Sequence, residues 1–287
     1  MIIYYSSWGL GNELLQYTYL RSVAKNEEKI FCLGGMDELA DSFDLNDPNF
    51  YIYSPSRFQN NIIRIIIFPL LCWLAKNRIF NFLAHRRDKN GYFLQTPTKT
   101  IGLIPINIVR TGYFQSETLF IWDRIKFTIK DKYVVEALKV FNSFPKHQTK
   151  VFIHIRRGDF LKEIYNNKKG VSLPFSYYSK AIRLIEDEVS LPFFIFLSDD
   201  YEYVQQAFRH IDDSDKFIST KHPAVDLHLM ALCEYGVCSN STFSWWGSYL
   251  MKNSKKVFFP KYWYGWKTKD ESHPGIQPSW SEVIDVN

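Results

Sequence analysis

The chain has 287 residues, 46% of them hydrophobic and 17% aromatic, which is enough to bury a sizeable core in one large α/β domain or in two smaller ones. Its net charge of +5, from 35 Lys and Arg against 30 Asp and Glu, is modest and dispersed, so it argues against nucleic-acid binding but suits a small anionic ligand. The four cysteines form no C-x-x-C pair, which argues against a zinc site or a disulfide framework.

The N-terminal stretch MIIYYSSWGLGN predicts a strand at Ile2–Tyr5 that enters a tight turn containing Gly9 and Gly11. Apolar residues at a helical spacing follow at Leu15, Tyr19 and Val23. The stretch lacks the basic flank, long apolar run and cleavage site of a signal peptide, so a cytoplasmic location is expected.

The most membrane-like segment is Ile62–Leu74, IIRIIIFPLLCWL. It is shorter than the ~20 apolar residues that a membrane span requires, and it contains Arg64 and Pro69. We interpret it as a buried or interfacial segment and keep peripheral contact with a membrane as a hypothesis.

Strand-like runs alternate with helical segments along the rest of the chain, which is typical of parallel sheets built from βαβ units. These runs are Val151–Ile155, Phe193–Leu197, Tyr235–Cys238 and Lys256–Phe259. A polar stretch with a proline, SFPKHQTK, precedes the first of them. We place a domain boundary there, which predicts domains at residues 1–145 and 146–287 and leaves open whether the C-terminal tail packs back on the first domain.

Two arginines follow the strand of VFIHIRRGDF directly. The carboxyl end of a strand in an open α/β sheet faces the ligand crevice, and Arg156 and Arg157 there could form bidentate bonds with a phosphate. Gly158 would let the backbone turn away sharply. The alternative is a structural ion pair with Asp159, but two adjacent arginines exceed that need, so we favour a phosphate site.

The next strand, in PFFIFLSDD, ends in Ser198, Asp199 and Asp200. Paired carboxylates at a strand end could hold a divalent metal, a ribose or an amide-bearing base, or could cap the helix expected from Tyr201. A further acidic cluster, DDSD at residues 212–215, lacks a flanking strand, so we interpret it as a solvated loop.

The stretch SNSTFSWWGSYL follows the strand at Tyr235–Cys238 and predicts a helix that begins at Phe243. The first N–H groups of a helix are free and form an anion site. Three hydroxyls add donors there, from Ser241, Thr242 and Ser244. This helix end and the two arginines are therefore expected to converge on one diphosphate, while Trp245 and Trp246 pack the helix onto the sheet.

Gly9, Gly11 and Asn12 form a second turn at a helix start. A G-x-G pattern is weak by itself. Its mechanical use would be to bring main-chain N–H groups and the Asn12 amide close to the bond that breaks, from the opposite domain.

Seven stretches in chain order together give a resemblance to the bacterial α-1,2-fucosyltransferases of glycosyltransferase family 11. They are GLGNELLQY, GYFQSETLF, HIRRGDF, PFSYYSKAI, FIFLSDD, DLHLMALCEYGVCSNSTFSWWGSYL and FFPKYWYGW. The resemblance implies a GT-B fold, α/β with two Rossmann-like domains facing a cleft. It also implies inverting transfer of L-fucose from GDP-fucose to a sugar hydroxyl, without a metal and with no cofactor besides the donor substrate.

Carried over to this sequence, the resemblance implies that Arg156 and Arg157 bind the GDP diphosphate and that His154 and Asp159 shape that pocket. The remaining donor-binding candidates are Gly9, Gly11, Asp199, Asn240, Ser241, Thr242 and Ser244. The expected catalytic residues are Arg156, Asp159, Asn12 and Glu13.

The sequence departs from the family pattern at Glu13, where glutamine is usual, at Leu15, where phenylalanine is usual, and at Trp8, where glycine is usual. These changes leave the acceptor and the linkage open. A carboxylate is the expected general base, with Asp159 and Glu13 as the candidates.

The resemblance implies as acceptor the 2-hydroxyl of a terminal galactose in a cell-surface glycan such as an O-antigen unit, lipid-linked or free, handled in the cytoplasm or at the inner face of the membrane. One alternative is transfer from another GDP-sugar or to another linkage. A glycoside hydrolase would need two carboxyl groups flanking the bond and no arginine pair. A non-catalytic glycan-binding protein would leave HIRRGD without a purpose. Neither a glycoside hydrolase nor a glycan-binding protein should bind GDP.

Overall fold

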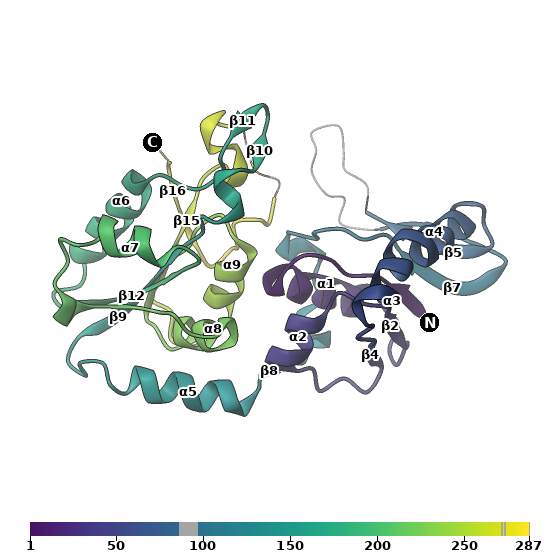
Figure 1. Ribbon diagram of the computed structural model, residues 1–287, viewed down its shortest axis with the longest axis horizontal. Helices are drawn as coiled ribbons and strands as arrows, with labels where there is room; N and C mark the ends of the chain where they lie inside the picture. Colours follow the sequence, from purple (N-terminus) through teal and green to yellow (C-terminus); the bar gives the residue numbers. More distant parts are fainter. Residues whose placement is uncertain (86–96, 271, 273, 287) are drawn as a thin grey trace. The chain divides into compact units, whose positions relative to one another are not determined.

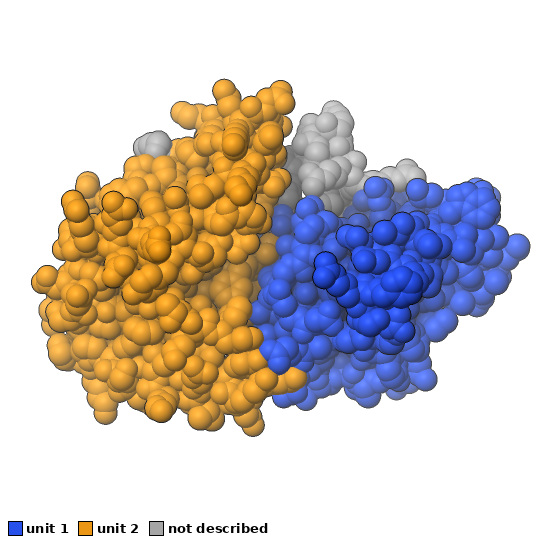
Figure 2. Space-filling view, in the orientation of Figure 1, with its two compact units in different colours: residues 1–128, 273–275 blue, residues 129–272, 276–287 orange. Residues whose placement is uncertain are grey.

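The computed structural model describes residues 1–287 except residues 86–96, 271, 273 and 287 (Figure 1). It divides into two compact units, coloured separately in Figure 2. Unit 1 comprises Met1–Thr128 and His273–Gly275, and unit 2 comprises Ile129–Ser272 and Ile276–Asn287. Helix α5 (Asp131–Phe141) lies between this division and the boundary expected near residue 145, which stays a prediction.

Unit 1 is built on a six-stranded sheet in the order β4-β2-β1-β7-β5-β6. The strands are β1 (Ile2–Tyr4), β2 (Ile30–Cys32), β4 (Phe50–Ile52), β5 (Phe80–Ala84), β6 (Thr98–Thr100) and β7 (Ile104–Val109). All neighbours are parallel except β5 and β6. Strands β2 and β4 lie on one side of β1, and the later strands β5 to β7 lie on the other. The order therefore reverses between β1 and β7, which makes this point the topological switch point of the sheet.

The helices of unit 1 begin with α1 (Leu10–Val23), which is buried on nearly all sides and confirms the helix expected after the first strand. The others are α2 (Asp37–Ser42), α3 (Arg57–Ile62), a π-helical turn η1 (Ile63–Ile67), α4 (Phe68–Lys76) and the 3-10 turns η2 (Glu117–Leu119) and η3 (Trp122–Arg124). Of two further short strands, β3 (Phe43–Asp44) belongs to unit 1 and β8 (Thr128–Ile129) spans the division between the units.

Unit 2 is built on a six-stranded sheet in the order β13-β12-β9-β14-β15-β16, with every neighbouring pair parallel. The strands are β9 (Thr149–Ile155), β12 (Pro192–Ser198), β13 (Lys216–Ile218), β14 (Tyr235–Val237), β15 (Lys256–Pro260) and β16 (Glu282–Ile284). In chain order this is 3-2-1-4-5-6, the arrangement of Rossmann folds, with the switch point between β9 and β14. The four strands expected in this part of the chain are confirmed.

Helices cover both faces of the unit 2 sheet (Figure 1). They are α5, α6 (Phe175–Glu186), α7 (Tyr201–Ala207), α8 (Pro223–Ala231) and α9 (Thr242–Tyr249). The smaller elements are η4 (Asp159–Leu161), β10 (Ile164–Tyr165), β11 (Lys168–Lys169), η5 (Asp213–Asp215) and η6 (Trp263–Lys267).

The packing of unit 2 follows from its apolar pattern. Alternate residues of β9, Val151, Ile153 and Ile155, enter one apolar cluster together with Tyr178 and Ile182 of α6, which lie one helical turn apart. Trp245 and Trp246 of α9 are 3% and 0% exposed, and the Trp245 ring packs edge-on against Trp280 while its Nε1 donates to Ile276 O at 3.1 Å. Both rings are thus in the interior of unit 2, and their packing of the helix onto the sheet stays a prediction. The core therefore fixes the carboxyl ends of β9 and β14 as one rigid edge.

Candidate functional site

The switch point of unit 2 gathers most of the residues that the sequence singled out. Ligands in open α/β sheets bind outside the carboxyl ends of the strands where the strand order reverses. Strand β9 ends at Ile155 and is followed by Arg156–Asp159, whereas β14 ends at Val237 and is followed by Cys238–Ser241. The two candidate segments lie about 80 residues apart in sequence, and the parallel pairing of β9 with β14 brings them to one edge.

The Arg156 side chain is held between two carboxylates. Its Nη2 lies 2.7 Å from Asp159 Oδ1 and its Nη1 lies 3.1 Å from Asp199 Oδ2. The Phe160 ring centroid is 5.5 Å from the guanidinium carbon. The side chain is still 37% exposed, and that of Asp159 is 65% exposed. The ion pair considered from the sequence is therefore present, and the guanidinium remains accessible to an incoming anion.

The Arg157 side chain is anchored in a different way. Its guanidinium carbon lies 3.5 Å from the Tyr203 ring centroid, and its Nε donates to Asp200 Oδ2 at 2.9 Å. Its main-chain N–H donates to Asp199 Oδ1 at 2.8 Å. Stacking and ion pairing together fix the plane of the guanidinium, which limits the entropy lost when it binds a ligand.

Gly158 permits the close approach of Asp199. A Cβ at this position would lie 2.5 Å from Asp199 Oδ2, a distance that real Cβ atoms essentially never show. A side chain at position 158 would therefore displace the Asp199 carboxylate, which also binds Arg156.

Asp200 performs the capping role that the sequence left open. Its Oδ1 accepts a hydrogen bond from the Tyr203 N–H at 3.1 Å, at the start of α7. The hydrogen bond from Arg157, together with that cap, lowers the pKa of this carboxyl below its usual value. The described residues contain no cluster of three or more His, Cys, Asp or Glu side chains that could hold a metal ion.

His154 joins the two halves of this edge. Its Nδ1 shares a hydrogen bond of 2.8 Å with Ser239 Oγ, which ties the end of β9 to the segment after β14. The ring is 5% exposed, and burial, followed by the charge of Arg156, lowers its pKa to about 3. His154 is therefore neutral at physiological pH and orients Ser239 instead of carrying charge.

The start of α9 is arranged differently from the expectation for its polar residues. The helix begins at Thr242, with Ser241 as its cap, and Ser241 Oγ accepts from the Phe243 N–H at 3.3 Å. Ser244 is buried and donates to main-chain oxygens of its own turn, the closer being Ser241 O at 3.2 Å. Among the hydroxyls expected to bind the ligand, that of the half-buried Thr242 is thus the more accessible.

Asn240 is completely buried, and its Nδ2 donates to Val171 O at 2.8 Å and to Trp263 O at 3.3 Å. Its Oδ1 is buried with no hydrogen-bond partner among the described residues. Asn240 thus holds two loops together beside the switch point. Direct contact of Asn240 or Ser244 with a ligand stays a prediction.

The N-terminal turn lies at the switch point of unit 1. Gly9 caps α1, and the Asn12 N–H donates to Gly9 O at 2.9 Å. The Leu10 N–H donates to Glu38 Oε2 at 2.8 Å, so a carboxylate already lies at this helix start. Asn12 Oδ1 accepts a bond of 3.4 Å from Gln115. The expectation that the donor faces Gly9, Gly11 and Asn12 stays a prediction.

Glu13 is 4% exposed, and its Oε2 accepts a hydrogen bond from the Leu39 N–H at 2.7 Å, in the first turn of α2. Burial, followed by the nearby Glu38 charge, raises its pKa to about 8. A neutral carboxylic acid that anchors α2 has the size, shape and charge of glutamine. This geometry favours a structural role for Glu13 over the base role considered from the sequence.

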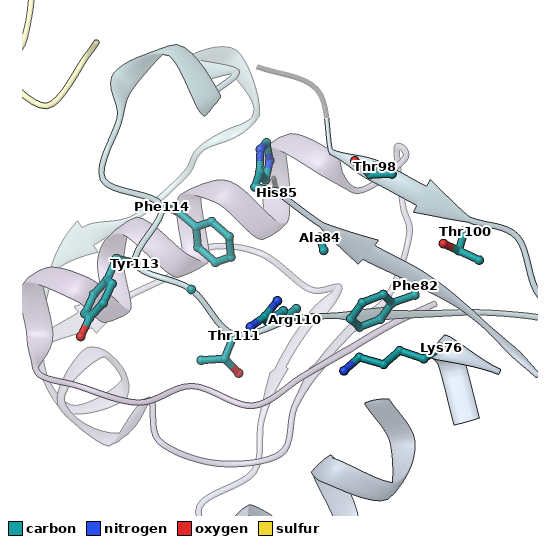
Figure 3. A pocket seen from close by; sticks show the side chains of 11 residues that line it. Lys76, Phe82, Ala84, His85, Thr98, Thr100, Arg110, Thr111, Tyr113 and Phe114 are labelled. Carbon is teal, nitrogen blue, oxygen red and sulfur yellow. The ribbon is translucent and has the colours of Figure 1, made fainter. Parts of the chain in front are cut away.

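Unit 1 also contains a pocket of about 780 Å³ at the carboxyl ends of β5 and β7 (Figure 3). Its lining residues are Lys76, Phe82, Ala84, His85, Thr98, Thr100, Arg110, Thr111, Gly112, Tyr113 and Phe114. In Figure 3, Arg110 and Phe82 lie at the centre of the lining, with Tyr113 and Lys76 on opposite sides. No strand was expected over Ile104–Val109, so this pocket could not be predicted from the sequence.

An exposed pair of aromatic rings borders the same pocket. Trp8 and Tyr113 stack with centroids 4.0 Å apart, and they are 44% and 42% exposed. Trp8 has φ +76, a conformation that side-chain-bearing residues rarely adopt. Gln16 Nε2 donates to Ser7 O and Gly112 O, each at 3.2 Å, and so fixes the turn after β1 against the turn after β7.

A family profile and several known proteins that are similar to this chain all point to one family of glycosyltransferases. The profile described as glycosyl transferase family 11 matches residues 76–283. An alpha-1,2-colitosyltransferase of Escherichia coli is 30% identical over 267 residues, which cover 84% of each chain. The O-antigen biosynthesis glycosyltransferase WbnK of Escherichia coli is 33% identical over 126 residues, 42% of this chain and 40% of that protein. The galactoside 2-alpha-L-fucosyltransferase Sec1 of Mus musculus is 31% identical over 51% of this chain and 43% of its own length.

Solved structures agree on the fold. Fucosyltransferase NodZ from Bradyrhizobium matches with a TM-score of 0.54 and 12% identity over 88% of this chain and 96% of that one. E. coli ADP-heptose lps heptosyltransferase II matches with a TM-score of 0.52 and 11% identity over 99% of this chain and 90% of that one. At these identities the likeness concerns the fold alone. The α/β fold class of GT-B type is confirmed.

Proposed function

This chain belongs to glycosyl transferase family 11, and on that premise we propose that it transfers L-fucose from GDP-fucose to the 2-hydroxyl of a terminal galactose in a cell-surface glycan. Its coarser class, a fucosyltransferase-like transferase of GDP-sugars, follows from the family. The choice of galactose rests on the names of relatives such as the mouse galactoside 2-alpha-L-fucosyltransferase. The proposed reaction inverts the anomeric centre and uses no metal.

The observation that carries this proposal is the accessible Arg156 guanidinium at the switch point of unit 2. In the proposed displacement, the acceptor oxygen forms a bond to C1 of the sugar while the bond from C1 to the β-phosphate oxygen breaks. Negative charge grows on the departing GDP. A preorganised cation and the N–H groups at the start of α9 stabilise that charge more strongly in the transition state than in the ground state.

We propose that Arg156 exchanges one of its two carboxylates for the diphosphate when the donor binds. Asp159 is the partner that can move, because its side chain is 65% exposed and lies on the short turn η4. Asp199 is held by the Arg157 N–H as well as by Arg156. We therefore assign Asp199 to positioning the arginine and Asp159 to release on donor binding.

The proton of the acceptor hydroxyl needs a base or solvent. Asp159, once released from Arg156, is the carboxylate that we propose for this step. Glu13 fits the step poorly because burial raises its pKa to about 8 and its oxygen is occupied by the Leu39 N–H.

We assign the acceptor to the pocket of unit 1 with its rim of Trp8 and Tyr113. Aromatic rings offer flat apolar surfaces with polar edges, which suit the C–H face of a pyranose ring. Thr98, Thr100 and Thr111 lie in the lining, and a hydroxyl can accept a bond from a sugar even when, like that of Thr111, it already donates to Tyr5 O at 2.7 Å. Strain at Trp8 supports a functional role for this position, since such conformations cluster at ligand sites.

A second donor is favoured by one observation: the relative matched over 84% of both chains is named a colitosyltransferase. Colitose is L-fucose without its 3-hydroxyl, so the two donors differ by a single group. We would incubate the purified protein with GDP-fucose, GDP-colitose and GDP-mannose, each with a panel of galactosides, and measure GDP release with and without EDTA.

Acceptor-dependent turnover of GDP-fucose that survives EDTA is the expected result. Preference for GDP-colitose would change the donor and leave the diphosphate site intact. Absence of turnover and of GDP binding would overturn the proposal.

A further inference from the structure

The long apolar helical segment of unit 1 presents an exposed apolar face. Helices α3, η1 and α4 form one continuous run, Arg57–Lys76, which is long and apolar enough to cross a membrane by length and composition alone. Only 17% of its most apolar window is buried. Of the two interpretations kept from the sequence, buried or interfacial, this exposure excludes complete burial and leaves the interfacial one as a prediction.

The exposed side chains lie on one side of the run. Ile66, Leu70 and Trp73, at spacings i, i+4 and i+7, are 60%, 52% and 58% exposed. Phe58 and Ile65 extend the face toward the N-terminal end, at 74% and 63% exposed. Isolated exposed apolar residues are ordinary, but a continuous row of this kind marks an interaction surface.

The opposite side of the run is fixed to unit 1. Ile63, Phe68 and Ala75 are buried in one cluster with Tyr5 of the segment after β1 and Ile108 of β7. The run cannot cross a bilayer while that side packs on the sheet. Figure 1 shows α3 and α4 lying along the outside of this sheet, and a helix so held can lie on a surface.

The charges around the face select the kind of surface. No Asp or Glu occurs between residues 48 and 85, whereas Arg57, Arg64, Lys76 and Arg78 are all exposed. The exposed apolar surface continues beside the end of α4. Leu103 is 90% exposed, and its N–H donates to Arg78 O at 2.9 Å, which places it next to the residues that follow the helix. Apolar side chains surrounded by cations complement the interface of a bilayer with anionic headgroups.

We propose that the face formed by Phe58, Ile65, Ile66, Leu70 and Trp73 docks on the surface of an anionic lipid bilayer. Lys76, the last residue of α4, also lines the pocket of unit 1. A glycan attached to a lipid would therefore meet the pocket close to the bilayer. The docking itself does not depend on the identity of the donor.

The test is sedimentation of the full chain with two vesicle preparations, one of phosphatidylethanolamine and phosphatidylglycerol at roughly 70 to 30 and one of phosphatidylcholine alone. The expected result is binding to the anionic vesicles that weakens at high salt. The double variant Ile66→Ser, Trp73→Ser should lose binding by about tenfold or more. The control Val135→Ser removes a side chain that is 66% exposed on α5 of unit 2 and should leave binding unchanged.

The depth to which Trp73 enters the bilayer is tested by quenching of tryptophan fluorescence with lipids that carry brominated acyl chains, added to the anionic vesicles. The wild type should be quenched, and Trp73→Phe, which keeps an apolar ring, should still sediment with much less quenching. Failure of the wild type to bind either preparation would overturn the proposal, as would equal binding by the double variant. A wild-type dimer that the double variant converts to a monomer would assign the face to a second copy of the chain. GDP binding by each variant reports separately on unit 2, so loss of docking and failure of the proposed function are distinguishable.

Discussion

Replacement of Glu13 by Gln separates a buried neutral acid from a catalytic base. The folded protein raises the pKa of Glu13 from 4.5 to about 8, so it retains a proton that the unfolded chain releases above pH 4.5. The contribution of Glu13 to stability must then fall as the pH rises from about 4.5 to 8, at about 1.4 kcal/mol per pH unit. Summed over that window, the loss is roughly 3 to 5 kcal/mol.

The Glu13→Gln variant removes this dependence and keeps an oxygen that accepts from the Leu39 N–H. We expect the two proteins to have similar stability near pH 5 and the variant to be progressively more stable toward pH 8. The assay is urea unfolding at several pH values and constant ionic strength, followed by circular dichroism. Glu27→Gln, at an exposed position, is the matched control and should run parallel to the wild type.

Parallel profiles for the wild type and Glu13→Gln between pH 5 and 8 would refute the reasoning, because they would mean that Glu13 is ionised throughout. The same variant also tests chemistry. Retention of the transfer rate within a few-fold is expected, whereas a loss of about 100-fold or more would make Glu13 the base.

Three further substitutions test the site. Arg156→Ala should lower the transfer rate by about 100-fold or more, because it removes the accessible cation; a variant with most of its activity would exclude the diphosphate assignment, and calorimetry with GDP would show whether binding is lost too. Gly158→Ala should displace Asp199, destabilise the protein by about 1–3 kcal/mol and weaken GDP binding. Unchanged stability and unchanged affinity for GDP would contradict the close contact between Gly158 and Asp199. Trp8→Ala breaks the stack with Tyr113, so it should raise the KM for a galactoside acceptor about tenfold or more while the KM for the donor stays constant. Equal changes in the two KM values would argue against an acceptor role for Trp8.

The strands of unit 2 were predictable because a parallel strand buried on both faces reads as a short continuous apolar run. The placement of Arg156 and Arg157 at one edge followed, since the carboxyl ends of parallel strands face the same crevice. The pairing of these arginines with Asp199 and Asp200 confirms that the ends of β9 and β12 meet.

The sequence did not reveal which polar groups face inward. Ser244 and Asn240 carry the donors that an anion site uses, but Ser244 donates within its own turn. Asn240 donates to Val171 O and Trp263 O, which belong to segments distant in the chain that no local pattern identifies. The apolar run at Ile62–Leu74 has the same composition whether buried or exposed, so periodicity alone could not show that Leu70 and Trp73 face solvent. The pKa of Glu13 depends on burial by segments distant in the chain, which no local pattern reports.

The position of β9 at the middle of its sheet has a consequence for synthesis on the ribosome. Both strands that flank β9 are translated after it, and its pairing of Val151 with Tyr235 must wait for roughly 80 further residues, which takes on the order of 4–16 s. During that interval one edge of an apolar strand has no neighbour, so the nascent chain needs protection from aggregation. The arginines emerge well before the start of α9, so the edge that we propose for the nucleotide is complete only after α9 has been made.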